Sequence, residues 1–97
     1  METLNYEYEA KGLLTRRAHV GVVGSGDLEV LIEPSSSLAT QVRVRTSVQG
    51  YAQVWKAVLD RVFAGFNNAA NVEINDFGAT PGTVTLRLEQ AAEEVRS

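Results

Sequence analysis

The chain has no cysteine and only one histidine, His19, among its 97 residues. Without cysteine, the fold can contain neither disulfides nor zinc held by thiolates, and one histidine leaves too few ligands for a usual transition-metal site. Any thiol chemistry in this protein must therefore come from a group attached to it.

Positive charge is also scarce, with 9 lysines and arginines against 12 acidic residues and a net charge of −3. A nucleic-acid surface would need a basic face. No apolar run approaches the roughly 20 residues that span a bilayer, and the first residues have neither the basic nor the apolar region of a signal peptide. We expect protein partners, no nucleic acid, no membrane, and a cytoplasmic location.

The composition is otherwise ordinary for a globular domain, with 44% hydrophobic and 22% charged residues. A chain of this size can bury one core, but it has little left for a substrate cleft with its own lid. We expect a single domain over residues 1–97, and an enzyme of this size would be uncommon.

Apolar and polar residues alternate in four segments of the first half, at residues 4–8, 16–23, 28–33 and 41–47. A period of two is typical of half-buried strands. The second and third segments are joined by a short glycine-rich link, so they should form a hairpin. A fifth, short strand is predicted at residues 72–76.

The period changes after Tyr51, where apolar residues recur every three or four positions as far as Phe66. This is the wide apolar face of a helix that packs on a core, so its aromatic residues are expected to be buried. Ser47 or Gly50 is placed to cap the start of this helix.

A second helix is predicted after Thr80, which would be its N-cap, with Pro81 as its first residue. Residues 83–86 also alternate like a strand. Strands followed by a helix, a strand and a helix predict an α+β two-layer sandwich. Its sheet should be mostly antiparallel, with four to five strands and both helices packed on one face.

Ser25 lies between Gly24 and Gly26. Glycines remove the side chains that would shield the hydroxyl and allow positive φ, so an exposed turn at the hairpin tip is expected. Such a serine is a nucleophile, a modification acceptor or simply a turn residue. As a nucleophile it would depend on His19 as base, and the G-x-S-x-G pattern is absent. The glycines match no phosphate-binding loop either.

Two segments together carry a family resemblance. The first is residues 23–31, VGSGDLEVL, and the second is residues 76–82, DFGATPG, followed by LRLEQA at 86–91. With these segments, the whole chain resembles the acyl carrier, or delta, subunit of malonate decarboxylase.

The resemblance implies a non-catalytic carrier. Ser25 would receive 2'-(5''-phosphoribosyl)-3'-dephospho-CoA through a phosphodiester, with triphosphoribosyl-dephospho-CoA as donor, and Gly24, Gly26 and Asp27 would form the surrounding site. The thiol of this arm would hold acetyl and malonyl groups as thioesters. The implied partners are the acetyl/malonate transferase and decarboxylase subunits, a phosphoribosyl-dephospho-CoA transferase and a malonyl transferase.

Several alternatives to this resemblance stay open. The chain could be a citrate lyase type of acyl carrier, an unmodified structural adaptor, or a small hydrolase that uses His19. Asp27 either caps the turn, which we favour, or positions the serine for a transferase. Four arginines that could pair with phosphates are predicted on solvated strand faces: Arg16, Arg17, Arg43 and Arg45.

Overall fold

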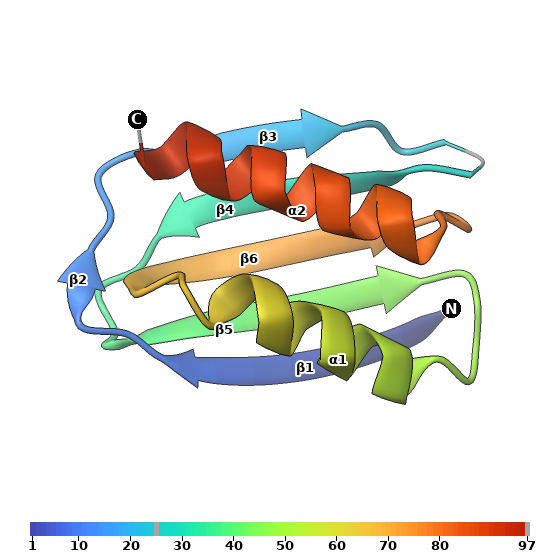
Figure 1. The fold of residues 1–97 in the computed structure, drawn as a ribbon, viewed down its shortest axis with the longest axis horizontal. Coiled ribbons are helices and arrows are strands. Elements are labelled where there is room, and N and C mark those ends of the chain that lie inside the picture. Colours follow the sequence, from blue (N-terminus) through green and yellow to red (C-terminus); the bar gives the residue numbers. More distant parts are fainter. Residues whose placement is uncertain (25, 97) are drawn as a thin grey trace.

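The structure is a computed structural model that describes residues 1–24 and 26–96. The described residues form six strands and two helices in the order β1, β2, β3, β4, β5, α1, β6, α2 (Figure 1). The strands are β1 (Glu2–Glu9), β2 (Gly12–Leu13), β3 (Ala18–Gly21), β4 (Leu28–Pro34), β5 (Ala39–Thr46) and β6 (Asn68–Asp76), and the helices are α1 (Ala52–Phe63) and α2 (Pro81–Arg96).

The strands make one mixed sheet in the order β1-β5-β6-β4-β3, with β2 beside β6 off this path. Three pairings are antiparallel, and β6 runs parallel to both β5 and β2. Both helices lie across the same face of the sheet (Figure 1). The predicted α+β two-layer sandwich is therefore confirmed, with a strand count slightly above the predicted four to five.

The core lies between the sheet and the helices because the apolar positions of both meet there. In β4 and β5, alternate residues such as Val30 and Val44 are fully buried. In α1 the buried residues are Trp55, Leu59 and Phe63, which are spaced by four and so face one side. Residues 83–86, which also alternate, are helical throughout.

The predicted cap of the second helix is confirmed, because the Thr83 amide donates to the Thr80 hydroxyl at 3.2 Å and the helix begins at Pro81. The predicted cap of the first helix is wrong. Its N-cap residue is Tyr51, with no side-chain cap bond. Gly50 instead donates its amide to the Glu2 carboxylate at 3.3 Å.

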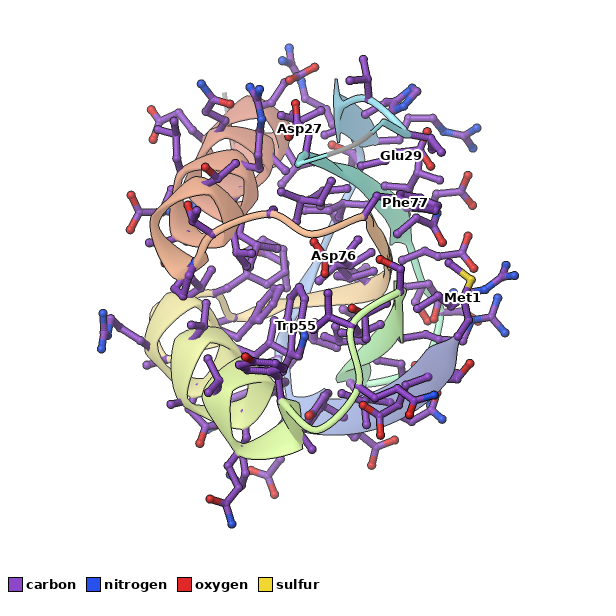
Figure 2. All side chains as sticks on the ribbon, turned by 90° about the vertical axis from the view of Figure 1, so that its right-hand side faces the viewer. Met1, Asp27, Glu29, Trp55, Asp76 and Phe77 are labelled. Atoms are coloured by element: carbon purple, nitrogen blue, oxygen red, sulfur yellow. The ribbon has the colours of Figure 1, made fainter. Side chains whose placement is uncertain are left out.

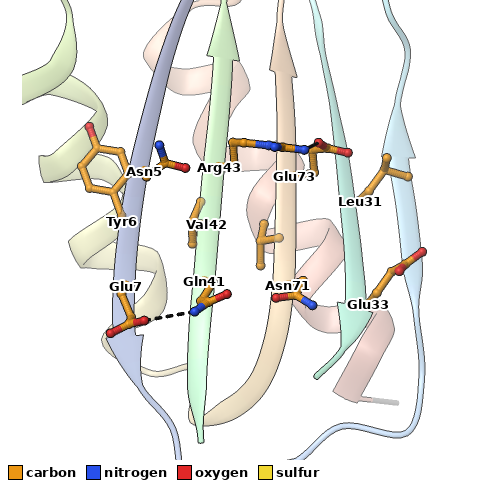
Figure 3. Close-up of a pocket in the computed structure, with 11 residues that line it drawn as sticks. Asn5, Tyr6, Glu7, Leu31, Glu33, Gln41, Val42, Arg43, Asn71 and Glu73 are labelled. Atoms are coloured by element: carbon orange, nitrogen blue, oxygen red, sulfur yellow. Dashed lines mark hydrogen bonds and ion pairs between the residues drawn. The ribbon is translucent and has the colours of Figure 1, made fainter. Parts of the chain in front are cut away.

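The other face of the sheet carries polar side chains. A hollow of about 710 Å³ lies on this face, and the residues that line it come from β1, β5, β6 and β4 (Figure 3). Gln41 donates to Glu7 at 3.1 Å, and Arg43 is paired with Glu73. This polar pairing explains how the face can remain in water without a second layer of helices.

Candidate functional site

The hairpin predicted around the glycine-serine segment is confirmed, since β3 and β4 are antiparallel and their last paired residues are Gly21 and Glu29. Ser25 itself lies outside the described residues. Its neighbours Gly24, Gly26 and Asp27 are described, and we call this segment the 24–27 turn. The Asp27 amide donates to the Gly24 carbonyl at 3.1 Å, which closes the turn.

The two glycines that flank Ser25 differ in conformation. Gly26 has a φ of +78°, which side chains disfavour, whereas Gly24 has no positive φ. Gly26 is exposed, and a Cβ built on it would meet nothing within 4 Å. A Cβ on Gly24 would meet only the Val22 side chain, at 3.9 Å. A side chain's first carbon would therefore meet no steric obstruction at either glycine.

The backbone of Phe77, which follows β6, forms two hydrogen bonds with the turn. Its carbonyl accepts a hydrogen bond from the Gly26 amide at 2.7 Å, and its amide donates to the Asp27 carbonyl at 3.0 Å. The two motif segments, far apart in the sequence, are thus side by side. Figure 2 looks onto this end of the molecule and shows Asp27, Phe77 and Asp76 together.

Arg87 of α2 holds the side chain of Asp27. Its Nε and Nη2 atoms donate to the two carboxylate oxygens at 3.3 and 3.1 Å, and its Nη1 donates to Gln90 at 3.3 Å. The Leu28 amide also donates to Asp27, at 2.7 Å. The hydrogen bond from Arg87, helped by that from Leu28, lowers the pKa of Asp27.

Asp76, the last residue of β6, holds the backbone next to Phe77 in place. It is 3% exposed, and its carboxylate accepts hydrogen bonds from the Thr46 hydroxyl at 2.8 Å and from the Ala79 amide at 3.0 Å. Its backbone carbonyl accepts from the Ser47 amide at 3.1 Å. Asp76 thereby fixes the chain between β6 and α2, on which Phe77 lies.

An apolar groove of about 370 Å³ opens between the starts of the two helices, at the same end as the turn. The prediction that the aromatic residues of the predicted first helix are buried is correct for Trp55, Phe63 and Phe66 and wrong for Tyr51, which is 50% exposed at this groove. Tyr51 precedes the helix, so it falls outside the regular stripe. The groove is lined by Val48, Tyr51, Val54, Trp55, Val58, Asp76, Gly78, Ala79, Thr80, Pro81 and Val84.

His19 belongs to the β3–β4 ladder, where it pairs with Leu31. Its Nε2 lies 2.9 Å from a carboxylate oxygen of Glu29, whose other oxygen accepts from Asn75 at 3.0 Å. The histidine is thus engaged by neighbouring strands on the polar face.

Two of the arginines considered for phosphate binding are already paired. Arg43 pairs with Glu73, and Arg17 lies 3.9 Å from Glu33. Arg45 is exposed on β5, as the alternation predicts. Arg16 is also exposed, but its predicted place on a strand is wrong, because β3 covers only Ala18–Gly21 of the predicted residues 16–23. The arginine that contacts the turn is Arg87, which the sequence pattern did not single out. Because it is 60 positions from Asp27, no local periodicity could have linked the two.

Residues 1–24 and 26–96 contain no group of three histidine, cysteine, aspartate or glutamate side chains placed to hold a metal ion. None of their helices is both long enough and apolar enough to cross a membrane.

Comparisons with known proteins agree over nearly the whole chain. The family model described as malonate decarboxylase delta subunit (MdcD) matches residues 15–95. The malonate decarboxylase acyl carrier protein of Azotobacter vinelandii is 55% identical over 98% of this chain and 97% of its own length. That of Pseudomonas aeruginosa strain UCBPP-PA14 is 53% identical over 97% and 96%, respectively.

The chain is also similar to a solved structure over nearly its whole length. It is a chain in the crystal structure of a Pseudomonas malonate decarboxylase hetero-tetramer in complex with malonate. That chain aligns with a TM-score of 0.92 at 50% identity, over 98% of this chain and 99% of its own length.

Proposed function

The chain belongs to the malonate decarboxylase acyl carrier (delta) subunit family, and from this premise we propose that Ser25 is the point at which its prosthetic group is attached. The chain is a carrier subunit and not itself a catalyst. We propose as the group 2'-(5''-phosphoribosyl)-3'-dephospho-CoA, whose thiol would hold acetyl and malonyl groups as thioesters.

The observation that supports this proposal is the construction of the 24–27 turn. A glycine loop without restraints would give a transferase no defined conformation to recognise. Here the backbones of Gly26 and Asp27 are hydrogen-bonded to Phe77, and the side chain of Asp27 is hydrogen-bonded to Arg87. At the same time, the space next to Gly26 is open. A held backbone in open surroundings suits an enzyme that must approach a hydroxyl and leave a large group on it.

The proposed modification is a phosphoryl transfer. The Ser25 oxygen would form a bond to the phosphorus nearest the ribose of triphosphoribosyl-dephospho-CoA, and the bond from that phosphorus to the outer two phosphates would break. Pyrophosphate would leave, and the hydroxyl proton would pass to a base of the transferase. The chain contains no cysteine, so the thiol that holds the acyl group must come from this attachment.

The carrier role follows from the tether. A long flexible arm converts each meeting with a catalytic subunit into an intramolecular event, with an effective concentration set by the arm length. We propose that the partners are the acetyl/malonate transferase and decarboxylase subunits, with the phosphoribosyl-dephospho-CoA transferase and malonyl transferase acting before the cycle.

The test is intact-mass measurement of the chain produced together with the transferase that makes and attaches the group. We expect one adduct of the mass of the phosphoribosyl-dephospho-CoA unit, located at Ser25 by peptide mapping. Ser25→Ala should abolish it. Ser36→Ala, in an exposed loop, is the matched control and should leave it complete. An unmodified chain that supports full turnover of the complex would identify a structural adaptor instead.

The remaining alternatives are separated by similar means. The relatives carry the malonate decarboxylase name, which favours that complex over citrate lyase. A small hydrolase would cleave an activated ester without modification and would lose that activity in His19→Ala. We expect no cleavage above background, and we expect His19→Ala to be modified as fast as the wild type.

A further inference from the structure

We propose that Arg87 is a positioning residue for the modification of Ser25, because it holds Asp27 and thereby the 24–27 turn in the conformation that the transferase recognises. This inference rests on the proposed function, since it concerns the same hydroxyl. It adds a residue of α2, distant in sequence, to a site for which the sequence analysis named only Gly24, Ser25, Gly26 and Asp27.

The geometry of the pair supports a positioning role. Arg87 uses two nitrogens on the two oxygens of Asp27, at 3.3 and 3.1 Å, so the planar guanidinium fixes the direction of the carboxylate as well as its location. Gln90, one turn along the helix, accepts from the third nitrogen at 3.3 Å and so orients the guanidinium. The side chains of Arg87 and Asp27 are 31% and 23% exposed, so water competes for the contact only in part.

The turn needs such a restraint because its own glycines make few contacts that would order it. Gly24 and Gly26 have no side chains to pack, and glycine loses the most conformational freedom when a loop is ordered. The restraints that the described residues show are the bond between Asp27 and Gly24, the two bonds to Phe77, the bond from the Leu28 amide to the Asp27 carboxylate and the Arg87 pair. The Arg87 pair alone joins the turn to the helical layer through side chains, which makes it the restraint that a substitution can remove without changing the backbone.

A looser turn should affect recognition more than chemistry. If only a fraction of molecules holds the competent conformation, the apparent affinity of the transferase falls by that fraction, while the bound complex still reacts normally. For a partly exposed ion pair, we expect Arg87→Ala to raise the KM for the carrier about fivefold with kcat nearly unchanged. Arg87→Lys keeps the charge but loses the two-pronged contact, so it should recover only part of the difference.

The experiment measures the rate of adduct formation by intact mass as a function of carrier concentration. Arg61→Ala is the matched control, because it removes an exposed arginine at the far end of α1. Asp27→Ala and the double variant with Arg87→Ala complete a cycle. If Arg87 acts through Asp27, the double variant should be no worse than Asp27→Ala alone.

Two readouts on the unmodified protein separate positioning from stability. Melting temperature should change little in Arg87→Ala, whereas the amide resonances of Gly24 and Gly26 should shift and the pKa of Asp27 should rise toward its ordinary value. Arg61→Ala should leave these resonances and this pKa unchanged.

The outcomes are distinguishable. Wild-type chain that gains no adduct at Ser25 would refute the proposed function. Wild-type chain that is modified there, while Arg87→Ala has the same KM and the same Gly26 resonance, would leave the function standing and refute the role of Arg87. Additive losses in the cycle would also refute it, because Asp27 and Arg87 would then contact the transferase independently.

Discussion

Asp76→Ala should destabilise the protein strongly. Asp76 is almost completely buried, and its removal deletes its hydrogen bonds with the Thr46 hydroxyl and the Ala79 amide. The amide then has no acceptor, and the hydroxyl keeps only the Val48 carbonyl, which it approaches at 3.3 Å. A hydrogen bond to a carboxylate contributes about 1.5–3 kcal/mol, so we expect the loss of both bonds to cost about 3 kcal/mol. In a domain of this size, that loss lowers the melting temperature by about 15 °C.

The matched control is Asp76→Asn, which keeps the shape. The amide oxygen can accept from Ala79, and the amide nitrogen can donate to the Thr46 hydroxyl, which then turns fully to the Val48 carbonyl that it already approaches at 3.3 Å. We expect a loss of only about 1 kcal/mol. Thermal unfolding followed by circular dichroism measures both variants. If Asp76→Ala melted within about 4 °C of the wild type, or no lower than Asp76→Asn, the two hydrogen bonds would not carry the stability assigned to them.

The remaining predictions concern the turn and the edge strand. Gly26→Ala should cost about 1 kcal/mol because its φ of +78° strains a side chain, whereas Gly24→Ala should cost less than about 0.5 kcal/mol in urea unfolding; equal effects would contradict this. Burial, together with the hydrogen bond to Asp60, raises the pKa of Tyr8 above its ordinary value of 10.0. This stabilisation is complete below pH 10 and is lost as the pH rises further, because the unfolded phenol ionises first. Tyr8→Phe should therefore flatten the fall of stability between about pH 10 and 11, and an unchanged pH dependence in this variant would contradict the prediction.

Much of the fold could be predicted because its signals are local. Alternation identified β1, β3, β4 and β5, but it predicted β6 only over residues 72–76 of the nine residues Asn68–Asp76. The spacing of Trp55, Leu59 and Phe63 identified α1. Thr80 followed by Pro81 identified the start of α2, since a cap needs only its own first turn. The two-residue β2 escaped prediction, because two residues are too few to show a period.

The site was predictable only in part. The glycine-serine segment indicated where to look, and the resemblance named the family. Positions 50 or more residues apart are joined by the hydrogen bonds of Phe77 with the turn and by the pairing of Arg87 with Asp27. Their partners are chosen by how β6 and α2 pack on β4, which no window of sequence contains.

The sequence by itself determined the two helices and, in whole or in part, every described strand except β2. It also determined which of their faces are apolar and that the chain has no thiol of its own, because these properties belong to neighbouring residues or to composition. Only the tertiary structure decided that β6 lies at the centre of the sheet beside a parallel β5, and that the end of β6 and a turn of α2 restrain the loop around position 25. Hydrogen bonds and ion pairs act over a few ångströms, so they depend on which distant segments folding brings into contact.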